Sequence, residues 1–333
     1  MRIIIPMAGE GKRLRPHTFT TPKPLFPILG KPVLQWLLEE VRAALSSPVE
    51  KMVFIVRDLK EEVKGFLKTL SNQWGAEAYF CEQAEPLGTA HAIYQAKEHL
   101  AGPCTILFAD TIFKASIQVP EEADGALWVK RVDKPQSYGV VELSPEGYIS
   151  RLIEKPEIPL SDLAIIGVYF LREAQHLIPA IEYLFEKGVR SKGEYQLTDA
   201  LQRLCDQGLR LRALPVEEWL DCGSRSLILR AQARLMDLGL APPSESPEIG
   251  KNVQIIPPVF IAKDAQVSES VLGPYVVVEK GARIRRSIIS HSLCRQGAVI
   301  ENSVLSEALI GVEAHCHNAL GSVDLGDYSR YGT

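Results

Sequence analysis

Residues 1–14 read MRIIIPMAGEGKRL, an apolar run that leads directly into a turn containing Gly9 and Gly11. The run Arg2–Pro6 has the length and composition of a buried strand. Similar runs follow, separated by segments with a helical period. They are Lys51–Val56, Ala76–Cys81 and Cys104–Ala109. Strands that alternate with helices predict a parallel sheet covered on both faces.

The clearest helical pattern covers Val33–Leu45. Its apolar residues share one face at the spacing of a helix: Leu34, Leu37, Leu38, Val41 and Leu45. Ligands of parallel sheets bind at the carboxyl ends of the strands. The loops after Met7, Cys81 and Ala109 are therefore expected to converge on one crevice.

From about Gly125 the chain becomes richer in strands, and further helices follow. The expected strands are Gly125–Val132, Tyr138–Leu143, Tyr148–Ile153 and Leu163–Leu171, and the expected helices are Ala174–Lys187, Gln196–Gln207 and Ser226–Leu238. Residues 240–248 are rich in proline and serine, which is typical of a linker. We therefore expect one domain over residues 1–240 and a second over residues 249–333.

Beyond the linker, aliphatic residues recur about every six positions. They are Ile249, Ile255, Ile261 and Val267, and then, less regularly, Val278, Ile284, Val299, Leu305 and Ile310. A hexapeptide period is typical of a parallel β-helix, in which each coil stacks on its neighbours to bury the inward aliphatic side chains.

Composition narrows the class of protein further. The hydrophobic and charged fractions, 46% and 23%, are those of a globular protein, and a net charge of −4 gives no broad attraction to nucleic acid.

The six cysteines are widely spaced, which is typical of reduced thiols. His315 and His317 flank Cys316, a trio that reads more readily as part of the repeat than as a metal site. No apolar run reaches membrane-spanning length, so we expect a cytoplasmic protein without a membrane segment.

The loop from Gly9 to Leu14 matches neither common nucleotide fingerprint. A dinucleotide-binding loop needs a third glycine where Leu14 stands, and a P-loop needs a glycine at Pro6 and a hydroxyl residue at Arg13. What remains is a turn after a strand, with Lys12, Arg13 and, shortly after, Lys23. Such a turn is either a solvated connection or a site where backbone N–H groups and cations gather on a polyphosphate.

Several motifs together favour the second interpretation. They are Gly-x-Gly-x-Arg-Leu-x-Pro-x-Thr from Gly9, Pro22–Leu25, Gln83 with Pro86–Ala90, Phe108–Asp110, Tyr138–Val140, Glu154–Pro156 and Trp219–Gly223. In this order they resemble the sugar-phosphate nucleotidyltransferases, the family of glucose-1-phosphate thymidylyltransferase and its uridylyl- and guanylyltransferase relatives. The resemblance implies a Rossmann-like α/β domain with a mixed, mostly parallel sheet, followed by a short left-handed parallel β-helix.

The resemblance also implies roles for single residues. Gly9 and Gly11 would wrap the triphosphate, and Arg13 and Lys23 would act on its phosphates as catalytic cations. The residues that would border the nucleotide are Gln83, Pro86, Gly88 and Thr89, with Gly88 leaving room for the base. Asp110 and Asp221 would be catalytic through Mg²⁺, which prefers carboxylate oxygens shared with substrate phosphates. Taken alone, Asp110 reads more readily as the cap of a turn.

The same resemblance places the sugar phosphate. Glu154 would take sugar hydroxyls and Lys155 would face the phosphate, although without the resemblance the two could be a surface ion pair of little value. Gly139 would let the sugar approach the backbone, and Ile165 and Gly167 would line the pocket. The reaction implied is attack by the sugar 1-phosphate on the α-phosphorus of the nucleotide, which requires positioning and charge stabilisation but no enzyme nucleophile.

The sequence leaves the substrates open. We expect dTTP or UTP with glucose 1-phosphate. A mannose-1-phosphate guanylyltransferase, a bifunctional N-acetylglucosamine-1-phosphate uridylyltransferase and an inert regulatory subunit are the alternatives. Retention of Arg13, Lys23, Asp110 and Asp221 argues against the inert subunit. The repeat tail is expected to mediate homo-oligomerisation.

Overall fold

A computed structural model describes residues 1–44, 47–115, 118–242 and 248–332. The chain divides into two compact units. The first comprises Met1–Gly9 and Leu37–Trp219, and the second comprises Glu10–Trp36 and Leu220–Thr333. Residues 243–247 of the predicted linker lie outside the described residues. The division into domains at residues 240–248 therefore stays a prediction.

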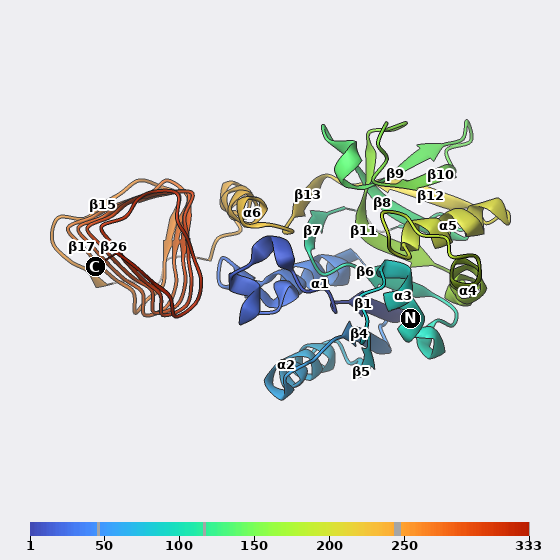
Figure 1. Cartoon of the computed structure of the whole chain (residues 1–333), viewed down its shortest axis with the longest axis horizontal. Coiled ribbons are helices and arrows are strands. Elements are labelled where there is room, and N and C mark those ends of the chain that lie inside the picture. Colours follow the sequence, from blue (N-terminus) through green and yellow to red (C-terminus); the bar gives the residue numbers. More distant parts are fainter. Residues whose placement is uncertain (45–46, 116–117, 243–247, 333) are drawn as a thin grey trace. The chain divides into compact units, whose positions relative to one another are not determined.

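The first unit is built on a mixed sheet with the strand order β10-β9-β11-β6-β1-β4-β5; in addition, β8 pairs with β11 and β12 pairs with β8 (Figure 1). The strands are β1 (Arg2–Pro6), β4 (Lys51–Val56), β5 (Glu77–Glu82), β6 (Cys104–Leu107), β8 (Gly125–Arg131), β9 (Gly139–Leu143), β10 (Ile149–Glu154), β11 (Leu163–Leu171) and β12 (Leu211–Pro215). Strands β6, β1, β4 and β5 are parallel, whereas β11 runs antiparallel to its neighbours β6, β8 and β9. The predicted mixed, mostly parallel sheet is confirmed.

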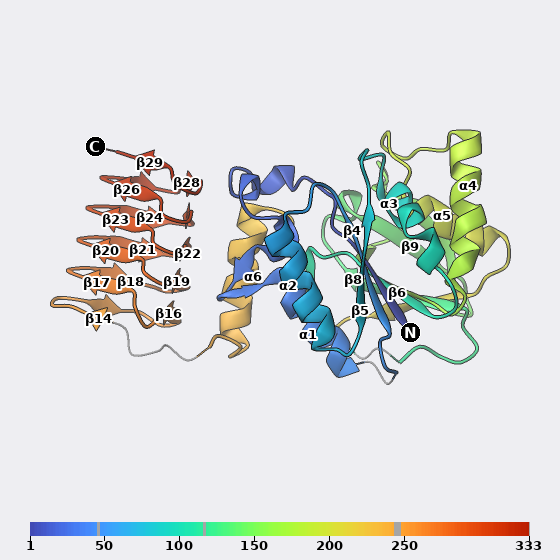
Figure 2. The same cartoon turned by 90° about the horizontal axis from the view of Figure 1, so that it is seen from below.

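Helices cover both faces of this sheet, as expected. Figure 2 shows α2 on one face and α3, α4 and α5 on the other. The helices are α2 (Glu61–Asn72), α3 (Thr89–Gln95), α4 (Leu177–Lys187) and α5 (Leu197–Asp206). Successive side chains of β1 point to opposite faces of the sheet, and Ile4 lies in the core formed with α3, α4 and α5. Helix α1 (Val33–Ala44) begins where predicted, and its expected last residue, Leu45, lies outside the described residues.

The second unit contains three parallel sheets whose short strands stack coil upon coil, which confirms the predicted β-helix (Figures 1 and 2). One sheet has β14 (Glu248–Ile249), β17 (Gln266–Ser268), β20 (Arg283–Arg285), β23 (Val299–Glu301), β26 (His315–His317) and β29 (Arg330–Tyr331); the next has β15 (Gln254–Ile255), β18 (Val271–Leu272), β21 (Ile288–Ser290), β24 (Val304–Ser306) and β27 (Leu320–Gly321); the third has β16 (Val259–Ile261), β19 (Val276–Val278), β22 (Ser292–Cys294), β25 (Leu309–Ile310) and β28 (Asp324–Leu325). Their inward side chains form a continuous apolar core.

The irregular repeat has a structural cause. Glu248 pairs with Gln266, Gln266 with Arg283, and Arg283 with Val299, so successive coils span 18, 17 and 16 residues. The strict hexapeptide register is therefore lost after the first coil. In β23 the core residue is Ile300, not the predicted Val299, because Ile300 pairs in register with the inward Ile284.

The second unit also contains the residues that follow the first strand. They form η1 (Lys12–Leu14), η2 (His17–Phe19), η3 (Lys23–Leu25), β2 (Pro27–Ile28) and β3 (Lys31–Pro32), and the unit further includes α6 (Arg225–Asp237). This division places the predicted phosphate-binding segment from Glu10 onward in the same compact unit as the β-helix.

The remaining predictions concern cysteines, histidines and membranes. All six cysteines are free thiols. Cys316 is completely buried in the β-helix core, and His315 and His317 flank it on β26. Among the residues that the structure describes, no helix combines the length and the apolar character needed to cross a bilayer.

Candidate active site

Gln83 directly follows β5 and is almost completely buried, with 6% of its surface exposed. Its side-chain amide donates to the carbonyl of Gly88 at 3.1 Å and lies 3.1 Å from Nδ1 of His91. These bonds fix the segment Pro86–Ala90, which leads into α3, against the carboxyl end of the sheet. Burial lowers the pKa of His91, so its ring is more readily neutral and able to accept this bond.

Gly88 is held where no other residue fits. Its φ of +121° is unfavourable for residues with a side chain, and a Cβ would lie 2.7 Å from the backbone nitrogen of Tyr195. The N–H of Tyr195 donates to the carbonyl of Leu87 at 2.9 Å, and the N–H of Ala90 donates to the carbonyl of Tyr195 at 2.9 Å. Thr89 is fixed too, because its hydroxyl donates to Gln196 at 2.9 Å and accepts from the N–H of Leu197 at 2.8 Å.

The predicted sugar-binding residues come together beside this loop in the first unit. A Cβ on Gly139 would lie 3.0 Å from Oε2 of Glu154 and 3.3 Å from Cδ1 of Ile165. Glu154 exposes only 11% of its side chain; Oε2 accepts from the hydroxyl of Thr198 at 2.8 Å, and Oε1 lies 3.2 Å from Nζ of Lys155. The structure therefore places a fixed, nearly buried carboxylate next to a glycine whose Cβ, if present, would make tight contacts.

Gly167 and Asp110 lie on neighbouring segments of the same unit. Gly167 has a φ of +87°, its carbonyl accepts from the N–H of Phe108 at 2.8 Å, and a Cβ would lie 3.0 Å from Cβ of Phe108. Phe108 follows β6, and Asp110 stands in the turn between β6 and β7 (Thr111–Lys114). Burial, and then the charges of Glu154 and Asp110, raise the pKa of Tyr169 on β11 far above its usual range. Both carboxylates therefore act on one buried phenol.

Three side chains near Glu154 were not predicted from the sequence: Thr198, Asp199 and Tyr169. Burial raises the pKa of Asp199, and the nearby Glu154 adds to the rise. Its Oδ1 accepts from the hydroxyl of Ser191 at 2.9 Å, while Oδ2 is buried with no hydrogen-bond partner among the described residues. The sequence offered one indication of Thr198 and Asp199: both lie in the first turn of the predicted helix Gln196–Gln207.

Of the other predicted residues, Gly9 belongs to the first unit, whereas Gly11, Arg13, Lys23 and Asp221 belong to the second. Gly11 has a φ of +61°, and its carbonyl accepts from the hydroxyl of Thr18 at 3.0 Å. A Cβ on Gly11 would lie 2.8 Å from Cγ2 of Thr18 and 3.2 Å from Cβ of Lys23. The turn therefore closes on itself and holds Lys23 next to Gly11.

Arg13 and Asp221 converge on Gly223. A Cβ there would lie 2.7 Å from Nη2 of Arg13 and 2.7 Å from Oδ1 of Asp221, the oxygen that accepts from the Gly223 N–H at 2.7 Å. Gly223 thus leaves space for a cation and a carboxylate to lie side by side.

The sequence matches the family described as Nucleotidyl transferase over residues 2–237.

The chain belongs to the nucleotidyl transferase family.

The family predicted from the motifs is thereby confirmed, and relatives extend the match beyond one domain. This nucleotidyl transferase is 29% identical to glucose-1-phosphate thymidylyltransferase of Streptomyces griseus and 30% identical to that of Streptomyces antibioticus, in each case over 99% of both chains. It is 33% identical to the bifunctional protein GlmU of Methanocaldococcus jannaschii over 71% of this chain and 55% of that protein. The solved UDP-glucose pyrophosphorylase complexed with UDP-glucose superposes with a TM-score of 0.60 and 25% identity, over 71% of this chain and 98% of that one.

Members of this family of sugar nucleotidyltransferases generally use a divalent metal. In the described part of this nucleotidyl transferase, no group of three or more His, Cys, Asp or Glu side chains could hold a metal ion. Mg²⁺ is commonly bound by one or two carboxylates together with substrate phosphates and waters. Asp110 in the first unit and Asp221 in the second each carry carboxylate oxygens of the kind that Mg²⁺ binds.

Proposed function

We propose that the chain joins a nucleoside triphosphate to a sugar 1-phosphate, giving a nucleoside diphosphate sugar and pyrophosphate. The observation that carries the proposal is the carboxylate of Glu154 beside Gly139. Its two oxygens are held by Thr198 and Lys155, and its side chain is 11% exposed. A buried carboxylate can accept hydrogen bonds from neutral hydroxyls, while a nearby ammonium suits a phosphate.

Residues of the turn would bind the triphosphate. Gly11 keeps the turn tight, and Arg13 and Lys23 bring positive charge to a substrate that carries several negative charges. Gly9 would let the chain approach the phosphates, because a Cβ there would meet nothing within 4 Å. Gln83, Pro86, Gly88 and Thr89 would border the nucleotide, on a loop whose backbone is fixed as described.

The chemical step needs no enzyme nucleophile. A phosphate oxygen of the sugar 1-phosphate forms a bond to the α-phosphorus, the bond from that phosphorus to the bridging oxygen breaks, and pyrophosphate leaves with the electron pair. Arg13 and Lys23 offset the repulsion between the two anions and stabilise charge on the transferring group. Asp110 and Asp221 would hold Mg²⁺, which supplies further charge neutralisation when bound.

Gly139, Ile165 and Gly167 would shape the sugar pocket. A Cβ at Gly139 would press on Glu154, and one at Gly167 would press on Phe108. Lys155 would bind the sugar phosphate, since its side chain is 47% exposed and its ammonium can leave Glu154 for a stronger anion. These residues would together position the sugar and, with it, the attacking phosphate.

Glucose 1-phosphate with dTTP is the pair we favour, followed by UTP, because the two thymidylyltransferases match this chain from end to end. The match to a bifunctional protein keeps N-acetylglucosamine 1-phosphate with UTP as the second candidate. We propose a scaffolding role for the β-helix, through homo-oligomers whose loss on deletion of residues 249–333 would be measured by light scattering.

The test is pyrophosphate release over a matrix of four nucleoside triphosphates and the 1-phosphates of glucose, mannose, glucosamine and N-acetylglucosamine, with Mg²⁺. We expect release that depends on both substrates and is fastest with dTTP and glucose 1-phosphate. Consumption of acetyl-CoA with glucosamine 1-phosphate would favour the bifunctional alternative. No release with any pair would identify an inert subunit.

A further inference from the structure

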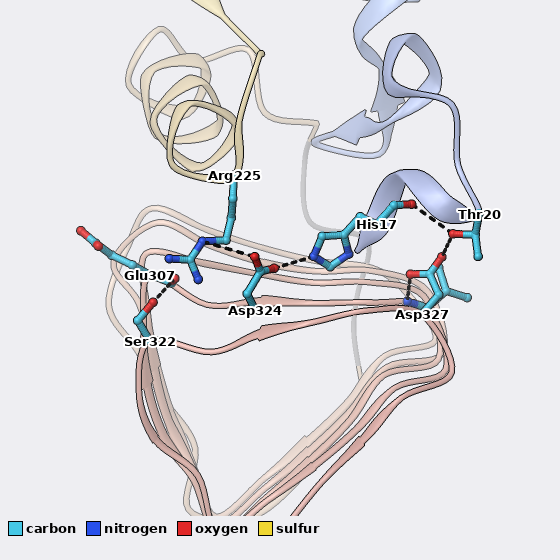
Figure 3. A network of polar contacts seen from close by, with 8 residues as sticks. His17, Thr20, Arg225, Glu307, Ser322, Asp324 and Asp327 are labelled. Atoms are coloured by element: carbon cyan, nitrogen blue, oxygen red, sulfur yellow. Dashed lines mark hydrogen bonds and ion pairs between the residues drawn. The ribbon is translucent and has the colours of Figure 1, made fainter. Parts of the chain in front are cut away.

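Polar contacts join the segment Pro16–Thr20 to the last coil of the β-helix (Figure 3). His17 is completely buried, and its Nε2 lies 2.7 Å from Oδ1 of Asp324, the first residue of β28. The other oxygen of Asp324 lies 3.9 Å from Nε of Arg225 at the start of α6. One carboxylate therefore connects three parts of the second unit that are far apart in sequence.

A second carboxylate, that of Asp327, lies in the same coil just after β28. Oδ2 of Asp327 accepts from the hydroxyl of Thr20 at 2.5 Å, while Oδ1 accepts from the N–H of Val312 at 2.8 Å (Figure 3). Asp327 is thus fixed by the preceding coil of the β-helix and offers its free oxygen to the segment. A Cβ on Gly326 would lie 3.0 Å from the ring of Pro16, so the two backbones approach closely between the two carboxylates.

The β-helix also fixes the chain a few residues further on, at Phe26. Phe26 is completely buried, and the guanidinium of Arg295 lies 4.8 Å from the centre of its ring. Arg295 is oriented by Glu279 at 3.0 Å, and both side chains are buried. A cation held over an aromatic ring away from water contributes more than one at the surface.

Of the residues proposed to bind triphosphate, Lys23 lies between these two anchors, and Gly11 and Arg13 lie just before the first. Thr18, between the anchored His17 and Thr20, donates its hydroxyl to Gly11, and Gly11 packs against Lys23. The anchored residues are therefore linked, through Thr18 and Gly11, to the turn that carries Arg13 and Lys23. A shift of Pro16–Thr20 would move the support on which both cations depend.

We propose that Asp324 and Asp327 are positioning residues, through which the last coil of the β-helix holds the 10–26 segment in the conformation that binds the nucleoside triphosphate. The proposal rests on the proposed function. It gives the repeat tail a role within its own chain, in addition to any role in assembly. Neither aspartate contacts substrate in this account; both act through His17 and Thr20.

The central variant is Asp324→Ala, which leaves Nε2 of the buried His17 without a partner, at a cost that is large for a buried polar group. Asp324→Asn keeps an acceptor oxygen and serves as the conservative rescue. Thr20→Val removes the contact to Asp327 from the exposed side of the segment and carries little risk to folding. Glu269→Ala is the matched control, because its carboxylate pairs with Arg285 at 3.4 Å on exposed coils away from the segment.

Two readouts are measured on the full-length protein: KM for each substrate, and hydrogen–deuterium exchange of residues 12–25. We expect Asp324→Ala to raise KM for the nucleotide about tenfold and Thr20→Val about threefold, with KM for the sugar 1-phosphate unchanged and faster exchange of the segment. Asp324→Asn should lie within about threefold of wild type, and Glu269→Ala should match it.

Unchanged exchange and unchanged nucleotide KM in both Asp324→Ala and Thr20→Val would overturn the proposal, as would equal increases in both KM values. If Asp324→Ala does not fold, Thr20→Val decides the question alone. A wrong reaction assignment is distinguishable, because it removes turnover from the wild type while the exchange of residues 12–25 still reports whether the β-helix holds the segment.

Discussion

Replacing Gly88 by alanine tests whether the loop before α3 is built on a close backbone approach. Two costs add at this position. A residue with a side chain at φ +121° is strained by about 1–3 kcal/mol, and a Cβ that must displace the backbone of Tyr195 adds about 1–3 kcal/mol of overpacking. The expected loss of folding free energy is therefore about 2–6 kcal/mol, a large share of the 5–15 kcal/mol typical of a domain.

Gly208→Ala is the matched control. Gly208 has a φ of +95°, yet a Cβ there would meet nothing within 4 Å, so this variant carries the backbone strain without the clash. Urea-induced unfolding of both variants measures the difference, and equilibrium dialysis with the preferred nucleotide measures the consequence for binding. We expect Gly88→Ala to be the less stable variant by about 1–3 kcal/mol and to bind nucleotide more weakly. Equal destabilisation of the two variants, with nucleotide affinity intact, would refute the reasoning.

Three further predictions follow from single side chains. Asp110→Ala should abolish magnesium-dependent pyrophosphate release while the circular dichroism spectrum is unchanged. Full release by that variant would show that Asp110 is not a ligand of Mg²⁺. Burial raises the pKa of Cys104 to about 11, so its thiol should react with iodoacetamide at pH 8 more than about 100-fold more slowly than a free cysteine, as peptide mass spectrometry would show. Because burial raises the folded pKa of Asp199, the stability that its protonated form provides is present below the ordinary aspartate pKa and is lost as pH rises through the raised value. In urea titrations Asp199→Asn should therefore gain stability relative to wild type as pH rises from about 4, the ordinary aspartate pKa, through the raised value, and a pH-independent difference would contradict this.

The outline of the fold was readable from local patterns. β1 and β4 have the predicted bounds, because an apolar run that follows a single charged residue and ends before a turn leaves little choice of limits. The mixed character of the sheet was not visible in the periodicity, since a buried antiparallel strand such as β11 reads like a parallel one. The β-helix was detected through its aliphatic repeat, whereas its shortened coils moved the core position to Ile300.

The candidate site shows a similar division. Glycines with special backbone requirements, such as Gly88 and Gly11, were predicted from motifs and have positive φ values with close neighbours. Thr198 was missed because its partner Glu154 is 44 residues away, and a single sequence does not show which helix end faces which strand. The contact between His17 and Asp324 spans 307 residues and could not be read from spacing at all.

The central claim is the transfer of a nucleotidyl group to a sugar 1-phosphate, and the fate of the α-phosphorus tests it most directly. The purified chain is incubated with Mg²⁺, glucose 1-phosphate and dTTP labelled at the α-phosphorus, and the products are separated by anion-exchange chromatography. The account predicts that the label moves into a nucleoside diphosphate sugar, only when the sugar 1-phosphate is present, and that the pyrophosphate released is unlabelled. Label that stays in the triphosphate with every sugar 1-phosphate and every base, or that leaves as nucleoside monophosphate, would contradict it.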